Sequence, residues 1–360
     1  MDGFKRANVY SIPPDVPFLK TLANAILDGS LLPPNFDNAD PLALSTITIY
    51  LPTQRSVRLL EDAFLEAVST PTLILPTIKA LGSVDEDDIY FDVNQFAEPD
   101  QSVPPAISPI TRQLVLTRLV MSWGQAMSKQ DSAVRSGDQP LLVPASPADA
   151  AWLAADLGDL LDRAITEEIS WDKLGSLVES KDLAAFWELS VEFLKIVTEL
   201  WPALLKERGL IDPATRRDLL IAQEQARLAT MDGPVIAAGS TGTLPSTARF
   251  LAAVAKLSNG RLVLPGFDKS LDDAFYEAIG GTDKRDQAIS GHPQYGLKQL
   301  LTDYVKILPS EVEELGTRNQ AAQDRSTLVS HAMLPAPVTC LLYTSPSPRD
   351  QRGTRMPSSA

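Results

Sequence analysis

The sequence has only one cysteine in 360 residues, Cys340, and only two histidines, His292 and His331. A single cysteine excludes a disulfide framework, and it excludes a zinc or iron–sulfur site held by several cysteines of this chain. Two histidines argue against a histidine-rich metal centre. We therefore predict no metal site, no bound cofactor and no catalytic residue of these kinds.

Long apolar runs are also absent. No stretch approaches the 18 apolar residues expected of a membrane-spanning helix. The N-terminal MDGFKRANVYSIPP lacks the apolar core of a signal peptide. We therefore expect a cytoplasmic protein with no membrane partner.

Basic residues are fewer than acidic ones, 32 against 46, and the formal net charge is −14. This balance argues against a self-sufficient nucleic-acid-binding protein, which normally presents a basic patch. Two interpretations stay open. The acidity is a solubility feature, or the chain is a subunit whose basic partner supplies most phosphate contacts.

The most informative stretch runs from Pro234 to Asp268. Residues 235–238 and 261–264 are short apolar runs that predict strands, and between them apolar residues recur at helical spacing from Phe250 to Leu257. Two strands joined by one helix imply a parallel sheet. The turn after the first strand is rich in small residues, namely Gly239, Ser240, Thr241, Gly242 and Thr243.

The N-terminal part has the same alternation of strands and helices. Strands are predicted at 8–12, 46–51 and 72–75, with helices over about 17–28 and 54–68. This β-α-β-α-β order is typical of a doubly wound α/β fold.

Residues 108–231 are predicted to be almost entirely helical. Ser146, three residues before Asp149, resembles a capping box at the start of one helix. We expect Trp152, Trp187 and Trp201 to lie in a core. The α/β core is therefore predicted to be split by a large all-helical insertion.

These patterns divide the chain into four segments: the first part of the α/β core at 1–105, the helical insertion at 106–232, the second part of the core at 233–337, and a tail at 338–360. The tail lacks periodicity, and its composition predicts disorder. Its CLLYTSPSPRD also resembles translated sequencing-adapter or vector DNA, so we expect the native reading frame to end near Thr339.

A nucleotide-hydrolysing α/β core needs a phosphate cradle after its first strand, G-x-x-x-x-G-K-[ST]. Lys20-Thr21 matches the last two positions, but Pro14 and Leu19 occupy the glycine positions. The prolines there have no N–H to donate, and Asp15 would repel phosphate. The sequence therefore predicts that ATP does not bind here and that Lys20 lies on a helix surface.

The turn at 239–243 is a second candidate cradle, because its backbone precedes a helix. A lone G-x-x-G is a weak signal, and both a structural turn and a contact with phosphate, above all of a DNA backbone, stay open. Asp268 follows the second strand of this unit, where a magnesium-binding aspartate would close a strand, but Pro265 to Phe267 intervene and favour a loop residue. No nuclease motif or Ser/His/Asp arrangement is supported.

Several ordered segments together resemble one family. VYSIPPDVPFLKTL, TITIYLPTQRSVRLLEDAFL, AAGSTGTLPSTARFLAAVAKL with LVLPGFD, and HPQYGLKQLL resemble the N-terminal part of the AddB family, over about residues 5–337. These are the B subunits of bacterial AddAB helicase–nucleases, which process DNA double-strand breaks. The resemblance implies a RecA-like parallel sheet of an inactivated superfamily-1 helicase domain, with the motor subunit AddA and DNA as partners.

The resemblance also implies that a second helicase-like domain and a nuclease with an iron–sulfur cluster follow in the complete protein. The function expected for this region is a non-catalytic scaffold that holds DNA and AddA during end resection, with a part in scanning single strands for a recombination hotspot. Two alternatives stay open: a phosphate-ligand-binding α/β enzyme that uses the 239–243 turn, or a pure protein-interaction module.

Overall fold

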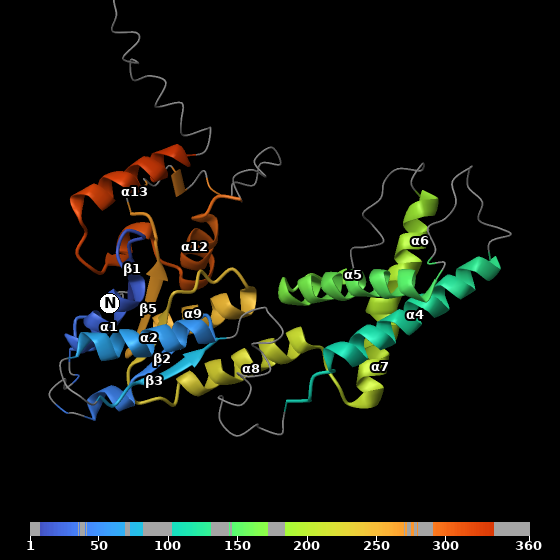
Figure 1. Cartoon of the computed structure of the whole chain (residues 1–360), viewed down its shortest axis with the longest axis horizontal. Helices are drawn as coiled ribbons and strands as arrows, with labels where there is room; N and C mark the ends of the chain where they lie inside the picture. Colours follow the sequence, from blue (N-terminus) through green and yellow to red (C-terminus); the bar gives the residue numbers. More distant parts are fainter. Residues whose placement is uncertain are drawn as a thin grey trace, which may run out of the picture. The chain divides into compact units, whose positions relative to one another are not determined.

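The computed structural model describes residues 8–34, 36, 40, 42–68, 73–81, 103–130, 144, 146–171, 184–269, 271, 275–276, 279 and 291–334. Two compact units emerge (Figure 1). The sheet unit comprises Met1–Leu81, Arg227–Thr243 and Thr247–Ala360, and the helical unit comprises Gly82–Ala226 and Leu244–Ser246. The acidic run at 85–88 and the tail at 338–360 lie outside the described residues.

The sheet unit is built on six parallel strands in the order β3-β2-β4-β5-β1-β6. The strands are β1 (Val9–Ile12), β2 (Thr48–Leu51), β3 (Thr77–Ala80), β4 (Val235–Ala238), β5 (Gly260–Pro265) and β6 (Glu313–Glu314). The fold class is therefore α/β, consistent with a RecA-like fold, as predicted. Strands from the two ends of the chain share this one sheet, because β2 pairs with β4 and β1 with β5.

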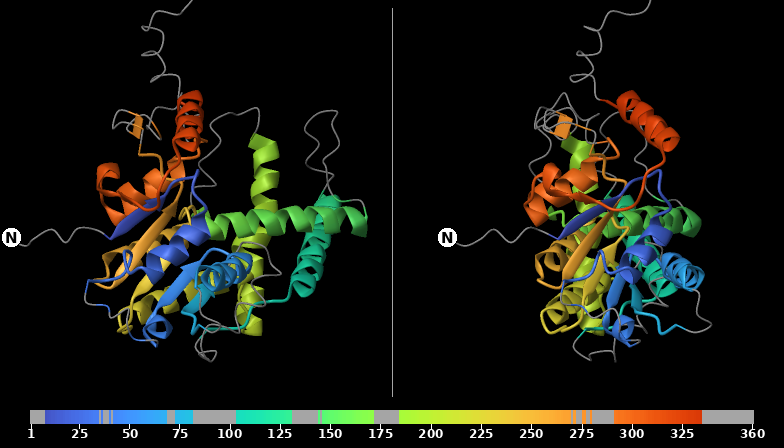
Figure 2. Two further views of the ribbon diagram at one scale, coloured as in Figure 1. Left: turned by 60° about the vertical axis from the view of Figure 1, so that its left-hand side comes forward. Right: turned by 90° about the vertical axis from the view of Figure 1, so that its left-hand side faces the viewer.

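Helices cover both faces of the sheet (Figure 2). Ile49 and Leu51 point to the face where α1 (Phe18–Leu27) and α2 (Gln54–Ala67) bury Leu22 and Phe64. Tyr50 points the other way, because side chains alternate along a strand. Its ring meets Phe250 of α9 (Pro245–Lys256) edge to face, with ring centroids 4.9 Å apart. The predicted strand–helix–strand unit β4-α9-β5 is confirmed, including its parallel pairing.

The prediction of a strand at 72–75 is wrong. Residue 72 lies outside the described residues, and 73–76 form no strand. The ladder starts only at Thr77, whose N–H donates to Ile47 O at 2.9 Å. Pro76 stands immediately before it, and a proline without an N–H is tolerated at a strand's start but not in its interior.

The helical unit contains the helices between β3 and β4. They are α4 (Pro109–Gln130), α5 (Pro147–Thr166), α6 (Ala184–Lys195), a π-helical turn (Ile196–Leu200), α7 (Trp201–Arg208) and α8 (Pro213–Leu228), the last of which runs on into the sheet unit. The capping box of Ser146 and Asp149 is confirmed. Gly209 ends α7 at a φ of 64°, in the left-handed region that glycine adopts without strain.

The expectation that three tryptophans lie in a core holds for one of them. Trp201 is 1% exposed. Trp152 is 76% exposed, so the prediction for it is wrong. On α5 the buried stripe runs through Ala150, Ala154 and Leu157, and a residue two positions from Ala150 points away from it. The side chain of Trp187 lies outside the described residues.

The last described elements follow β5. They are α12 (Tyr295–Gln299), a π-helical turn (Leu300–Val305), a 3₁₀ turn (Pro309–Glu311), β6 and α13 (Gln320–Ala332), and another 3₁₀ turn, Ala43–Thr46, precedes β2. None of the helices in the described part of the chain combines the length and the apolar character needed to cross a membrane.

Candidate functional site

A cavity of about 460 Å³ opens at the carboxyl ends of β1, β5 and β6, beneath α13. Its floor comes from the residues that follow β1 and β5, and its roof from one side of α13. Open parallel sheets bind ligands at this edge. The volume falls in the range of small-molecule sites, about 300–1,000 Å³.

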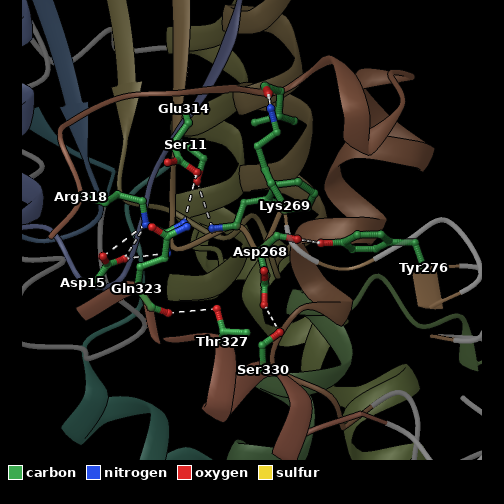
Figure 3. A network of polar contacts seen from close by, with 12 residues as sticks. Ser11, Asp15, Asp268, Lys269, Tyr276, Glu314, Arg318, Gln323, Thr327 and Ser330 are labelled. Carbon is green, nitrogen blue, oxygen red and sulfur yellow. Dashed lines mark hydrogen bonds and ion pairs between the residues drawn. The ribbon is translucent and has the colours of Figure 1, made fainter. Parts of the chain in front are cut away.

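Asp15 and Arg318 form the central ion pair of this cavity (Figure 3). Arg318 Nη2 donates to Asp15 Oδ1 at 2.9 Å, and Nε lies 3.2 Å from both carboxylate oxygens. The Asp15 side chain is only 6% exposed. The guanidinium hydrogen bonds hold the pKa of Asp15 below its ordinary value, so the carboxylate stays charged. Arg318 Nη1 also lies 3.8 Å from Glu314 Oε2.

The loop after β5 is held in place by two polar side chains. Phe267 N–H donates to the hydroxyl of buried Ser11 on β1 at 3.0 Å. Gln294 donates to Gly266 O at 3.0 Å and accepts from Asp268 N–H at 3.2 Å. These contacts fix the backbone that forms the cavity floor.

Asp268 ties this loop to α13. Ser330 Oγ donates to the Asp268 carboxylate, and the Tyr276 hydroxyl donates to Asp268 O at 2.6 Å (Figure 3). Burial, together with the nearby charge of Asp268, raises the pKa of Tyr276, so its phenol remains a donor. No residue of α13 itself is buried. Two polar contacts tie this end of the chain to the sheet unit, that of Ser330 with Asp268 and, just before the helix, that of Arg318 with Asp15.

His292 lies in the cavity wall with its two ring nitrogens in different roles. Nδ1 accepts from Gln294 N–H at 3.1 Å. The ring proton of neutral His292 is therefore on Nε2, which is buried and faces the Met333 backbone without a hydrogen bond of ordinary geometry. Ser330, Asp268 and His292 consequently do not form a catalytic triad, because the accepting nitrogen is already used by Gln294.

Burial lowers the pKa of His292 from its ordinary 6.5. The folded protein thus favours neutral His292, so its contribution to stability is present above pH 6.5 and is lost as the pH falls through the lower folded-state pKa. We expect the His292 ring resonance to titrate with a midpoint below 6.5 in proton NMR. The chain has only two histidines, and His331→Asn assigns the signals. A midpoint at or above 6.5 would contradict this expectation.

The predicted turn at Gly239–Thr243 lies at the same sheet edge, after β4, but it does not line the cavity. Gly239 N–H donates to Val263 O at 3.0 Å, and Gly242 N–H points to Ser240 Oγ at 3.4 Å. Both glycines have positive φ, and a Cβ on Gly242 would lie 3.0 Å from Leu300 Cδ1. Of the five residues, only Ser240, Thr241 and Thr243 keep N–H groups without a hydrogen bond to the described residues.

Lys20 lies outside the cavity as well. Its side chain is 65% exposed on α1 and pairs with Glu66 of α2 at 2.7 Å. The helix-surface position predicted for Lys20 is confirmed.

The sequence did not reveal the cavity as a site. Asp15 and Asp268 each follow a strand, and carboxyl ends of parallel strands meet at one edge, so their proximity was open to inference. The sequence around Arg318 did not mark it as a site residue, because no local pattern indicates that its side chain contacts Asp15. Within the described ranges no group of three or more histidine, cysteine, aspartate or glutamate side chains is arranged to hold a metal ion.

Neither a scan against protein-family models nor a search of curated proteins finds a match to this chain.

Proposed function

We propose that this chain is a helicase-like region without motor activity, part of a subunit of a DNA double-strand-break repair helicase–nuclease. It acts as a scaffold for DNA and for an AddA motor subunit during end resection. The resemblance of its ordered segments to the AddB family supports the proposal. The same proposal includes a more detailed fold assignment, namely an inactivated superfamily-1 helicase domain with a helical insertion.

One observation carries it. The sheet keeps the parallel order in which β1 lies between β5 and β6, and a phosphate cradle would follow β1. That position holds Pro13 and Pro14, which have no N–H, and Asp15, whose carboxylate is locked onto Arg318. A triphosphate would find prolines without N–H groups and an aspartate already paired with Arg318, where nucleotide-hydrolysing proteins present N–H groups and a lysine.

We expect no micromolar, magnesium-dependent binding of ATP by the chain in isothermal titration calorimetry. Lys20→Ala removes only a surface ion pair with Glu66 and should leave the titration unchanged. Circular dichroism of both proteins provides the control for folding. Magnesium-dependent ATP binding that disappears in Lys20→Ala would show a working nucleotide site and overturn the proposal.

Scaffolding is tested by fluorescence anisotropy of a blunt-ended DNA duplex, with and without purified AddA. The proposal expects DNA binding that strengthens when AddA is present and weakens steeply with salt. Thr241→Glu adds a negative charge at the 239–243 turn and should weaken binding several-fold if this turn touches DNA phosphates, whereas Ser45→Glu, on an exposed 3₁₀ turn, should not. Binding of AddA without DNA would indicate a pure interaction module instead.

A further inference from the structure

The helical unit exposes large apolar side chains where α4 and α5 pack against each other (Figure 1). At this contact Gln113 Nε2 of α4 donates to Ala151 O of α5 at 2.7 Å. Trp152, the next residue on α5, is exposed, as are Ile110 and Leu114 on α4. Tryptophan is highly buried on average in folded proteins. Exposed apolar side chains of this size, contributed by both helices beside one contact, are typical of an interaction surface.

The outward face of α5, here called the α5 face, continues from Trp152 and is acidic. Its residues recur at intervals of three or four along the helix, so they share the side opposite the buried Ala154 and Leu157. The exposed members are Trp152, Asp156, Asp159, Leu160, Arg163 and Glu167. Asp156 and Asp159 form no hydrogen bond or ion pair with any described residue, so both carboxylates are available to a partner.

The chemistry of the α5 face selects a partner that carries cations. Carboxylates attract ammonium and guanidinium groups, and so does the face of an indole ring. Guanidinium suits both, because it pairs with a carboxylate through two hydrogen bonds and stacks on an aromatic ring. Leu160 adds an apolar contact for the aliphatic stem of an arginine or a lysine. The phosphate groups of a nucleic acid would be repelled by the same carboxylates.

We propose that the α5 face docks a basic, arginine-rich segment of a partner protein. Arginine side chains of that segment lie over Trp152 and pair with Asp156 and Asp159. One interpretation of the net charge of −14 is a chain whose basic partner supplies the phosphate contacts, and the α5 face gives such a partner a docking site. The proposal goes beyond the scaffold function and depends on neither AddA nor the 239–243 turn.

The experiment titrates the full chain into fluorescein-labelled octa-arginine and octa-lysine peptides and follows their fluorescence anisotropy. We expect saturable binding that is stronger for octa-arginine, because guanidinium stacks on an indole better than ammonium does. Binding should weaken with added salt, since the charges of the α5 face are exposed. The peptides involve neither DNA nor AddA, so a negative result here would leave the scaffold proposal standing.

Matched variants test the location. Trp152→Ala and the double variant Asp156→Asn/Asp159→Asn should each weaken octa-arginine binding about threefold or more, because each removes exposed contacts of modest strength. Circular dichroism of each variant checks that its fold is unchanged. The control, Asp62→Asn/Glu207→Gln, removes the same charge from exposed positions of α2 and α7 and should bind as the parent does.

Three outcomes would overturn the proposal. In the first, both variants of the α5 face bind octa-arginine as the parent does, or the control weakens binding equally. In the second, the chain self-associates in light scattering and Trp152→Ala abolishes this, which would identify a second copy as the occupant. In the third, the face variants weaken binding of a blunt-ended DNA duplex instead, which would identify a nucleic-acid surface.

Discussion

Replacing Arg112 with alanine is expected to lower the free energy of unfolding of the helical unit by about 3–5 kcal/mol, the usual effect of removing one partner of a buried ion pair. Arg112 is 6% exposed on α4. Its Nη1 lies 2.6 Å from Asp162 Oδ2 and its Nε 3.4 Å from Asp212 Oδ1. Alanine would leave Asp212 buried, with the Trp201 indole, at 3.0 Å, as its side-chain donor among the described residues.

The pKa of Asp212 makes the expected loss of stability depend on pH. Burial already raises its pKa, which means that the charged form is costly even with Arg112 present. In Arg112→Ala the carboxyl would therefore take up a proton more readily, and the loss of stability should be smaller in mildly acidic solution than at pH 7.

The positions of the tryptophans allow the unfolding of the helical unit to be measured separately. All five tryptophans of the chain fall within 82–226, so their fluorescence during urea denaturation reports on the helical unit alone. Arg118→Ala changes an exposed arginine of the same helix and should shift the midpoint little. A loss below about 1 kcal/mol for Arg112→Ala would mean that the ion pair contributes nothing beyond its own desolvation.

Gly260→Ala is expected to destabilise the sheet unit by about 3 kcal/mol, at the upper end of the usual range for overpacking. Gly260 is the first residue of β5, and a Cβ there would lie 1.9 Å from Val254 O on α9. Because the obstacle is backbone, relief requires the end of α9 to move away from the sheet. That movement would disturb the pairing of β5 with both β4 and β1.

Hydrogen exchange followed by mass spectrometry locates this effect. Peptides from β4 and β5 should lose protection, and thermal unfolding followed by circular dichroism should begin at lower temperature. In Gly296→Ala the new Cβ would meet only Thr243 Cγ2, at 3.2 Å, so a loss below about 1 kcal/mol is expected. Equal effects of the two substitutions would contradict the steric argument.

The sequence predicted the sheet well where the pattern of apolar residues agrees with glycine and proline at the element boundaries. The β4-α9-β5 unit has two apolar runs, an amphipathic helix and glycine or proline at each boundary, and the structure reproduces it. The prediction of a strand at 72–75 is wrong. The apolar residues there suggest a strand, but the strand begins only after Pro76. The two-residue β6 was missed because Glu313 and Glu314 carry no hydrophobic signal at all.

The candidate site was less accessible to sequence reasoning. The absence of a phosphate cradle near Pro14 could be read directly, because it depends on adjacent residues. The cavity depends on contacts across the chain, such as Arg318 with Asp15, 303 residues apart. The two glycines at 239–243 give a clear local pattern, but their φ angles serve the turn and their N–H groups are used within the fold.

The strand order has a consequence for how the chain is made. β1 pairs with β5 and β6, and β2 pairs with β3 and β4, so the first strands emerge from the ribosome long before most of these neighbours. At about 5–20 residues per second, translation from β1 to β5 takes about 10–50 s. During this interval the exposed edges of β1 and β2 can pair with other chains. We therefore expect the yield of soluble protein, more than its final stability, to respond to chaperones and to the rate of synthesis.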